Sequence, residues 1–183
     1  SAQFADCGIH AMHMASFVTG QEVERLSADT VSCIASRELE DDAMVNFRMT
    51  GGTVGRLWTS SVAIGRQHGL EIQVFGEKGG LRWEQERPNF LYRLSDMDAL
   101  QVYKPGHAYN SRLSLDGTKL PPGHPEGIFD AMGNIYRGVA RAIRGQTYNN
   151  GEFPTMTDGV RGLNFIEATV ASHKGGNVWV DLD

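Results

Sequence analysis

Asp6 and His10 stand four residues apart in the stretch Asp6-Cys7-Gly8-Ile9-His10, near the start of the 183-residue chain. Residues at this spacing share one face of a helix, so the carboxylate and the imidazole can face the same cleft. There the carboxylate can orient the ring and stabilise its protonated form, which suits a group that transfers protons. The plainer alternative is that Asp6 only caps the helix and His10 is a polar surface residue.

His13 follows His10 by three residues, a spacing that two metal ligands on one helix can have. The sequence offers no third ligand at a matching distance, and the two cysteines, Cys7 and Cys33, form neither a metal-cluster pattern nor a disulfide framework. We therefore predict no metal site and treat His13 as a solvated or partly packed side chain.

A second group of candidate residues lies in segment 104–125, which is rich in Gly, Pro, Ser and Asn and is predicted to be one long loop. Tyr109, Asn110 and His124 carry groups that can bind substrate hydroxyls, and loops often carry such residues. The alternative for the end of this segment is structural: Pro125 stiffens the loop, and Glu126 complements the dipole of the following helix.

Hydrophobic periodicity and turn signals predict the elements that must position these residues. A first helix is expected from Gly8 to Thr19, with Asp6 as its N-cap and Gly20 as its stop. Strands linked by hairpins follow, because apolar and polar residues alternate and glycine pairs turn the chain. The expected strands cover residues 26–34, 43–49, 54–62, 70–74, 81–86, 90–94 and 100–103.

The last third of the chain is predicted to be mostly helical. Apolar spacing indicates an amphipathic helix from residue 128 to 143, ending at Gly145. A capping box of Thr155 and Asp158 starts a last helix that closes at residues 174–176, and a final strand follows at 178–182.

The expected fold class is α+β: a single domain over residues 1–183, with an open, mostly antiparallel sheet and helices on one sheet face. The other face must then meet water or a partner. Outward tryptophans such as Trp58 or Trp179 would suit a symmetric dimer interface on that face.

Composition excludes several classes of function. The chain has 17 Lys and Arg against 22 Asp and Glu, a formal net charge of −5, and no basic run, which argues against nucleic acid or an anionic membrane as partner. The sequence has neither a membrane-spanning apolar stretch nor a secretory leader, and its two cysteines fit a reducing cytoplasm. It also has no G-x-G-x-x-G turn and no P-loop, so the chain itself has no visible dinucleotide site.

Several stretches, in order, resemble the Gfo/Idh/MocA family of oxidoreductases, which includes glucose-fructose oxidoreductase and inositol dehydrogenase. Residues 6–10 resemble the family's D-x-G-x-H motif at the first helix of its C-terminal domain, and residues 71–81 resemble its strand–turn segment. Residues 83–89 and 123–127 are similar to the sugar-acting branch, and 154–180 resemble the last helix and strand. The likeness covers nearly the whole chain.

The resemblance implies a two-domain protein in which a preceding Rossmann domain binds NAD or NADP. In that protein this chain would supply much of the site for a sugar or polyol, and it would form a homodimer or homotetramer through the open sheet. His10 would take up or return the hydroxyl proton while the nicotinamide exchanges a hydride, with Asp6 as the supporting partner. The family's E-K-P lysine has no counterpart here, since Glu77-Lys78 is followed by glycine. The family's usual aspartate three residues after the histidine is His13 here, which leaves the role of that position open.

The expected function is therefore the substrate-binding and oligomerisation half of an NAD(P)-dependent dehydrogenase. Because the motif begins at Asp6, we expect a preceding segment, and we expect this chain alone to be inactive. Two alternatives remain: a non-catalytic carbohydrate-binding or dimerisation module, and a metal-dependent hydrolase that uses His10, His13 and an acidic group.

Overall fold

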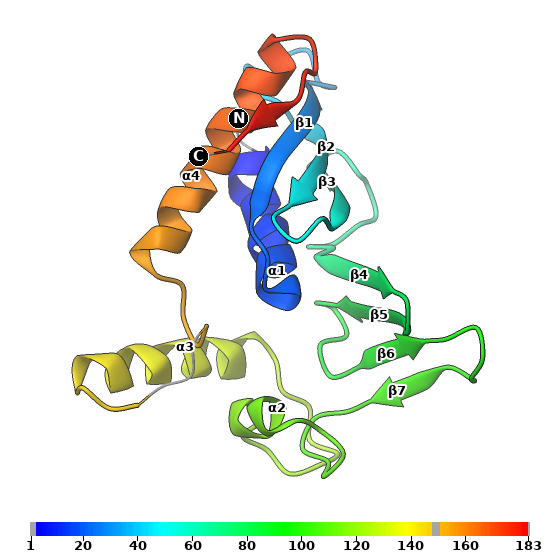
Figure 1. Ribbon diagram of the computed structural model, residues 1–183, viewed down its shortest axis with the longest axis vertical. Helices are drawn as coiled ribbons and strands as arrows, with labels where there is room; N and C mark the ends of the chain where they lie inside the picture. Colours follow the sequence, from blue (N-terminus) through cyan, green and yellow to red (C-terminus); the bar gives the residue numbers. More distant parts are fainter. Residues whose placement is uncertain (1–2, 148–150, 183) are drawn as a thin grey trace. The chain divides into compact units, whose positions relative to one another are not determined.

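The computed structural model describes residues 3–147 and 151–182 and divides the chain into two compact units (Figure 1). Unit 1 combines Ser1–Arg66 with Pro154–Asp183, and unit 2 is Gln67–Phe153. That the chain forms a single domain, as its sequence suggests, stays a prediction.

The two units contain different sets of elements. Unit 1 has a π-helical turn η1 and two α-helices with four strands: η1 Phe4–Gly8, α1 Ile9–Thr19, β1 Val23–Val31, β2 Asp42–Met49, β3 Val54–Ser60, α4 Met156–Lys174 and β8 Val180–Asp181. Unit 2 has four strands and two α-helices: β4 Glu71–Gly76, β5 Gly79–Glu84, β6 Leu91–Leu94, β7 Gln101–Tyr103, α2 Arg112–Gly117 and α3 Ile128–Ile143.

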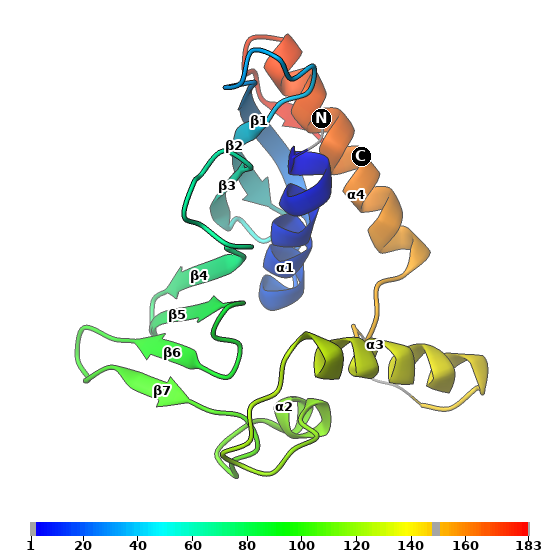
Figure 2. The ribbon, with the colours of Figure 1, turned by 180° about the vertical axis from the view of Figure 1, so that it is seen from behind.

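Unit 1 is an antiparallel sheet in the order β3-β2-β1-β8 with two helices on one face. The register pairs Ala28 with Val45 and Val45 with Leu57, so the buried side chains of three strands line up in one row. Phe165 of α4 and Met12 of α1 close the core over this row. Figure 2 shows both helices in front of the sheet. The alternation in the sequence is thus the alternation between a buried and an exposed sheet face.

The exposed face of this sheet carries large side chains of mixed character. Met44 is 60% exposed and Trp58 is 51% exposed, and the Trp58 indole donates to Asp42 over 3.0 Å. The guanidinium groups of Arg25 and Arg48 lie 5.4 and 5.3 Å from the ring centroid of Trp179. Aromatic, methionine and arginine side chains on one face are typical of a protein interface.

The C-terminal end of α4 completes the free edge of β1. Strand β8 pairs with β1 only at Arg25 and Leu26. Beyond that point the fully buried Ser172 hydroxyl accepts the Ala28 N–H over 2.8 Å and donates to the Val178 carbonyl over 2.6 Å. His173 Nδ1 accepts the Thr30 N–H over 3.3 Å. Two backbone groups that a neighbouring strand would normally satisfy are therefore bonded to helix side chains.

Unit 2 is an antiparallel meander in the order β4-β5-β6-β7, followed by α2 and α3. Three side chains bond to the carbonyl end of α2: Lys119 Nζ and Arg137 Nη1 donate to the Asp116 carbonyl over 2.8 and 3.1 Å, and Asn134 Nδ2 donates to the Gly117 carbonyl over 2.7 Å. These donors complement the negative end of the helix dipole and tie α3 to α2. Burial, with Arg137 nearby, lowers the pKa of Lys119.

The sequence analysis is right about the fold class and wrong about three details. Asp6 is not an N-cap, because the helix extends upstream through the π-turn and the Asp6 backbone lies inside it. The expected single sheet is two four-stranded sheets, since no hydrogen-bonded pairing joins β3 to β4 in the described residues. The long loop 104–125 contains α2, which Ser111 caps by accepting the Ser114 N–H.

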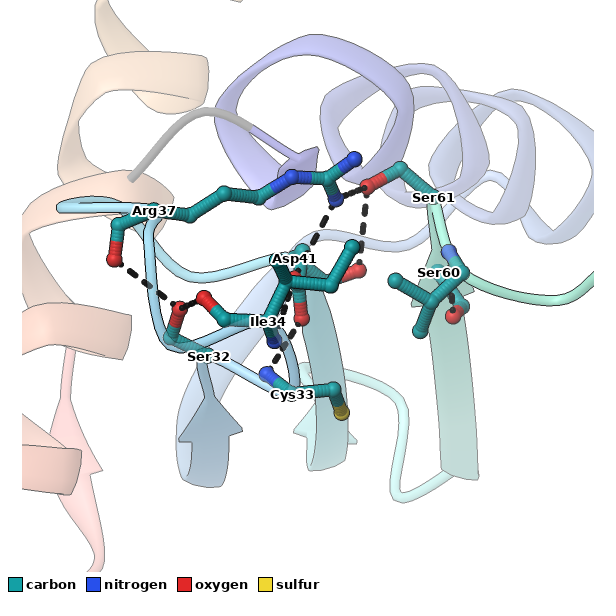
Figure 3. A network of polar contacts seen from close by, with 8 residues as sticks. Ser32, Cys33, Ile34, Arg37, Asp41, Ser60 and Ser61 are labelled. Carbon is teal, nitrogen blue, oxygen red and sulfur yellow. Dashed lines mark hydrogen bonds and ion pairs between the residues drawn. The ribbon is translucent and has the colours of Figure 1, made fainter.

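The β1–β2 connection is organised by one buried carboxylate (Figure 3). Asp41 is 2% exposed, and its two oxygens accept the N–H groups of Cys33 and Ile34 over 2.7 and 3.2 Å. Arg37 Nη1 lies 3.1 Å from the same carboxylate and donates to the Ser61 hydroxyl over 3.0 Å. The Cys33 N–H is the main cause that lowers the pKa of Asp41, and burial opposes it. Although these residues border a surface hollow, their polar groups are bonded to one another, which indicates a structural role.

Replacing Ser172 by alanine should lower the free energy of unfolding by about 1–3 kcal/mol, because it removes the bonding partner of both Ala28 N–H and Val178 C=O inside the protein. Chemical denaturation followed by circular dichroism measures the change. Ser36→Ala, in the exposed β1–β2 connection, is the matched control and should stay within about 0.5 kcal/mol of the wild type. An equal effect of both variants would contradict the assigned role.

Replacing Asp41 by asparagine should make thermal stability less dependent on acidic pH. Because the pKa of Asp41 is lowered by folding, its contribution is present above the unfolded-state pKa and is lost as pH falls through the folded one. Between about pH 5 and pH 2 the wild-type Tm should therefore fall more steeply than that of Asp41→Asn. Glu38→Gln, in the same connection, serves as control, and its Tm should follow that of the wild type. Parallel curves of Tm against pH for all three proteins would show that Asp41 does not cause the loss of stability at acidic pH.

Candidate functional site

The first helix contains the residues that the sequence singles out for proton transfer. It opens with the π-turn Phe4–Gly8 and continues as α1, and Gly20 ends it in the left-handed conformation at φ 67°. Asp6 lies within the π-turn and His10 follows in the first turn of α1. Single π-turns within helices occur frequently at functional sites, so the backbone itself marks this position.

Asp6 and His10 lie on the side of the helix that faces away from the core. Phe4, Gly8 and Met12 are buried, whereas Asp6 and His10 are exposed. Within the described residues, neither side chain has a hydrogen bond or an ion pair with another residue, and none joins them to each other. Both groups are therefore accessible to a ligand from the same side of the helix.

Gly8 and Ile9, which lie between Asp6 and His10 in the sequence, pack closely against two neighbouring elements. A Cβ on Gly162 of α4 would come within 2.6 Å of Ile9 Cδ1, so Ile9 occupies space that any other residue at 162 would fill. A Cβ on Gly8 would lie 3.4 Å from Thr59 Cγ2 of β3, and Gln3 Nε2 donates to Thr59 Oγ1 over 3.3 Å. In this motif Gly8 and Ile9 fix the helix, whereas Asp6 and His10 face outward.

His13 faces the N-terminus of α4 rather than a metal-binding group. There the capping box predicted from the sequence is present: the Asp158 carboxylate accepts the Thr155 N–H over 2.6 Å. The Thr155 hydroxyl and N–H are the main causes that lower the pKa of Asp158, and the nearby charges of His13 and Arg161 add to them. Arg161 also bridges to Glu22 over 2.9 Å. His13 therefore belongs to a surface charge network between α1 and α4.

In residues 3–147 and 151–182, no three side chains of the types His, Cys, Asp or Glu come together in a way that could hold a metal ion. Likewise, no helix in this part of the chain is long and apolar enough to cross a membrane.

Tyr109 and Asn110 of unit 2 have well-defined local contacts. The Tyr109 ring stacks on His107 with centroids 5.0 Å apart and meets Tyr103 edge-on at 5.5 Å. The Tyr109 hydroxyl accepts the Lys104 N–H over 3.1 Å, and Asn110 Nδ2 donates to the Lys104 carbonyl over 2.7 Å. These bonds hold the loop, while Tyr109 remains 55% exposed. The cluster presents an aromatic ring to solvent on a fixed backbone.

His124 lies exposed at the end of a tight turn. Its N–H donates to the Pro121 carbonyl over 3.1 Å, and Gly123 occupies the turn position with φ 89°. Its ring nitrogen Nδ1 lies 3.2 Å from the same carbonyl. The turn fixes the direction of the ring and leaves the rest of the imidazole in solvent.

Sequence reasoning missed the role of Glu126. Its carboxylate does not serve the α3 dipole but accepts the N–H groups of Lys119 and Leu120 over 2.5 and 2.6 Å. Its backbone N–H and C=O both bond to the side chain of Asn89, over 2.9 and 2.8 Å. The N-terminal group of α3 is bonded by Asp130 instead, which accepts the Gly127 N–H. No local signal indicates a contact to Asn89, since it spans 37 residues of sequence.

The structure thus brings Asp6 and His10 together on one helix of unit 1, and it places Tyr109, Asn110 and His124 in the loops of unit 2. Their assignment as catalytic or substrate-binding residues stays a prediction.

Comparison with known proteins shows which molecules share this arrangement. Residues 1–82 match the model of the GFO/IDH/MocA C-terminal domain. The chain is 30% identical to the uncharacterised oxidoreductase YfiI of Bacillus subtilis (strain 168), over 97% of this chain and 47% of that protein.

Solved structures agree with this match. An oxidoreductase from Sinorhizobium meliloti superimposes with a TM-score of 0.90 at 36% identity, over 97% of this chain and 52% of that chain. An inositol dehydrogenase homolog from Azotobacter vinelandii, solved with NADH and myo-inositol, superimposes with a TM-score of 0.81 at 30% identity, over 96% of this chain and 48% of that one. The chain therefore spans about half the length of the relatives it matches.

Proposed function

This chain belongs to the GFO/IDH/MocA oxidoreductases as their C-terminal domain, and from that premise we propose that it is the substrate-binding and oligomerisation half of an NAD(P)-dependent dehydrogenase acting on a sugar or polyol. The observation that carries the proposal is the outward pair Asp6 and His10 on a helix fixed from both sides. The inositol dehydrogenase homolog that was solved with NADH and myo-inositol supports the cofactor and the substrate class.

In this proposal the cofactor is held mainly by the half of the protein outside this chain. The paired strands of the described residues are all antiparallel, and the sequence has no glycine-rich dinucleotide fingerprint, which supports this placement of the cofactor. Hydride chemistry is the contribution of the cofactor, and this chain contributes proton transfer and substrate contacts.

Oxidation of a hydroxyl carbon requires removal of the hydroxyl proton, and reduction requires its return. In this proposal the imidazole of His10 accepts and returns that proton. Asp6, one turn upstream on the exposed side, is the supporting partner of His10 in this proposal. Tyr109, Asn110 and His124 bind substrate hydroxyls, with the exposed Tyr109 ring packing against the apolar face of the sugar.

Replacing His10 by alanine in the full-length protein should lower kcat about 100- to 10,000-fold, which is the usual range for loss of a general acid–base. The measurement is NADH formation over a panel of polyols and sugars that includes myo-inositol. His13→Ala, an exposed histidine on the same helix, is the matched control and should keep nearly the wild-type rate. Near wild-type turnover of His10→Ala would exclude His10 from the reaction and favour a non-catalytic module.

We also propose that a second copy of the protein covers the exposed sheet face of unit 1. Met44 lies on β2, between β1 and β3 in the sheet, and it pairs with Asp29 of β1 and with Trp58 of β3. An apolar, aromatic and arginine-containing face of this kind suits the self-complementary contact of a twofold dimer.

Replacing Met44 by lysine should shift the full-length protein from oligomer to monomer, raising the dimer dissociation constant at least about 10-fold, because the variant places a charged ammonium group in the interface, where it loses its water. Analytical ultracentrifugation at micromolar concentration measures the assembly. Ser36→Lys adds the same charge away from this face and should leave the mass unchanged. A monomeric wild type, or an unaltered oligomer of Met44→Lys, would contradict the proposal.

A further inference from the structure

Helix α3 exposes a row of large apolar side chains along its whole length. Phe129 is 89% exposed, Ile143 81%, Tyr136 67% and Met132 40%. Intervals of three, four and seven residues place these side chains on one side of a helix. In a folded protein such a stripe is normally a buried face. It shares Met132 and Ile143 with the apolar spacing that predicts this helix from the sequence.

Within unit 2, α3 also makes polar contacts. Asn134 and Arg137 donate to the carbonyl end of α2, and Arg141 Nη1 bridges to Glu152 over 3.2 Å. A Cβ on Gly138 would lie 2.8 Å from Phe153 Cδ1, which shows how closely the following segment packs on that side. Unit 2 therefore fixes α3 through one side by hydrogen bonds and leaves the apolar stripe uncovered. Apolar surface arranged in this way marks an interaction site.

The stripe differs in composition from the exposed sheet face of unit 1. Phe129, Met132 and Ile143 form an aliphatic and aromatic row, whereas the sheet face mixes tryptophan with arginine and aspartate. Permanent contacts resemble a protein core cut in half, whereas transient contacts are about as polar as the rest of the surface. The apolar composition of the stripe therefore suits a permanent contact.

The relatives show that such a part exists in proteins of this kind. The match includes 97% of this chain but only 47% of YfiI and 52% of the Sinorhizobium structure. In each of these relatives about as much chain again lies outside the matched part. The stripe also starts next to the loop that we assign to the substrate, since Phe129 follows His124 by five residues. A cofactor that exchanges a hydride with the substrate must be held in contact with it, so the cofactor-binding half has to lie close to that loop.

We propose that the apolar stripe of α3, formed by Ile128, Phe129, Met132, Tyr136 and Ile143, is the docking face for the half of the protein that binds the dinucleotide. This inference rests on the proposed function, because it takes the two-domain organisation from it. The contact buries aromatic and aliphatic side chains and holds the cofactor half against the substrate loops.

Site-specific photo-crosslinking in the full-length protein tests the proposal. Phe129 is replaced by p-benzoylphenylalanine, a larger aromatic residue that keeps the phenyl ring, and after irradiation mass spectrometry identifies the peptide attached to it. We expect attachment to peptides of the half outside this chain. Attachment to unit 1, attachment to a second copy, or the absence of any cross-link would each overturn the proposal.

The same substitution at Phe75 provides a matched control, because Phe75 is also an aromatic residue of unit 2 and is 73% exposed on β4. It should capture the cofactor half at a several-fold lower yield than position 129. Equal yields at both positions would show no preference for the stripe and would overturn the assignment.

NAD(P)-dependent turnover of the unlabelled protein separates this inference from the proposed function. Turnover combined with cross-links to unit 1 or to a second copy overturns the docking face alone. Cross-links to the outside half without turnover of any sugar or polyol leave the docking face in place and overturn the proposed reaction.

Discussion

The contact between Ile9 of α1 and Gly162 of α4 is the constraint on which the candidate site depends. The absence of a side chain at Gly162 lets Ile9 enter the surface of α4, while Gly8 brings the same turn close to Thr59 of β3. The contacts of the adjacent residues Gly8 and Ile9 thereby fix the position of the first helix and its rotation about its own axis. His10 comes next in the chain, so its direction follows from packing that does not involve it. The packing therefore fixes where the His10 backbone lies and toward which side of the helix its side chain extends.

This arrangement separates the residues that stabilise the motif from those that face outward. The buried positions Phe4, Gly8 and Met12 hold the helix on the sheet, and the exposed positions Asp6 and His10 remain available. Because the polar pair has no bond to other described residues, it adds little to stability and carries little structural penalty when it is changed. Such a division lets a fold keep its core while the chemistry at its surface differs between relatives.

Local patterns in the sequence predict most of the helices and strands, but they predict fewer of the contacts between them. The helix at 128–143 and the capping box of Thr155 and Asp158 are found correctly, because apolar spacing and cap chemistry act within one or two turns. The π-turn around Asp6 has no comparable signal in the residue types of Phe4–Gly8. The bond between Asn89 and Glu126 depends on chain segments far apart in sequence. Interactions within one or two helical turns can be predicted from residue types, whereas contacts between distant segments are seen only in the three-dimensional structure.

The way in which Ser172 and His173 bind to β1 limits how this protein can assemble. An exposed strand edge offers unpaired N–H groups to which a foreign strand can add, and this is a common route to aggregation. Here the N–H groups of Ala28 and Thr30 already have side-chain acceptors, so an incoming strand finds no free donor at these positions. Growth of the sheet into a fibril-like ribbon is blocked on this side by two side chains of a helix rather than by charge or proline.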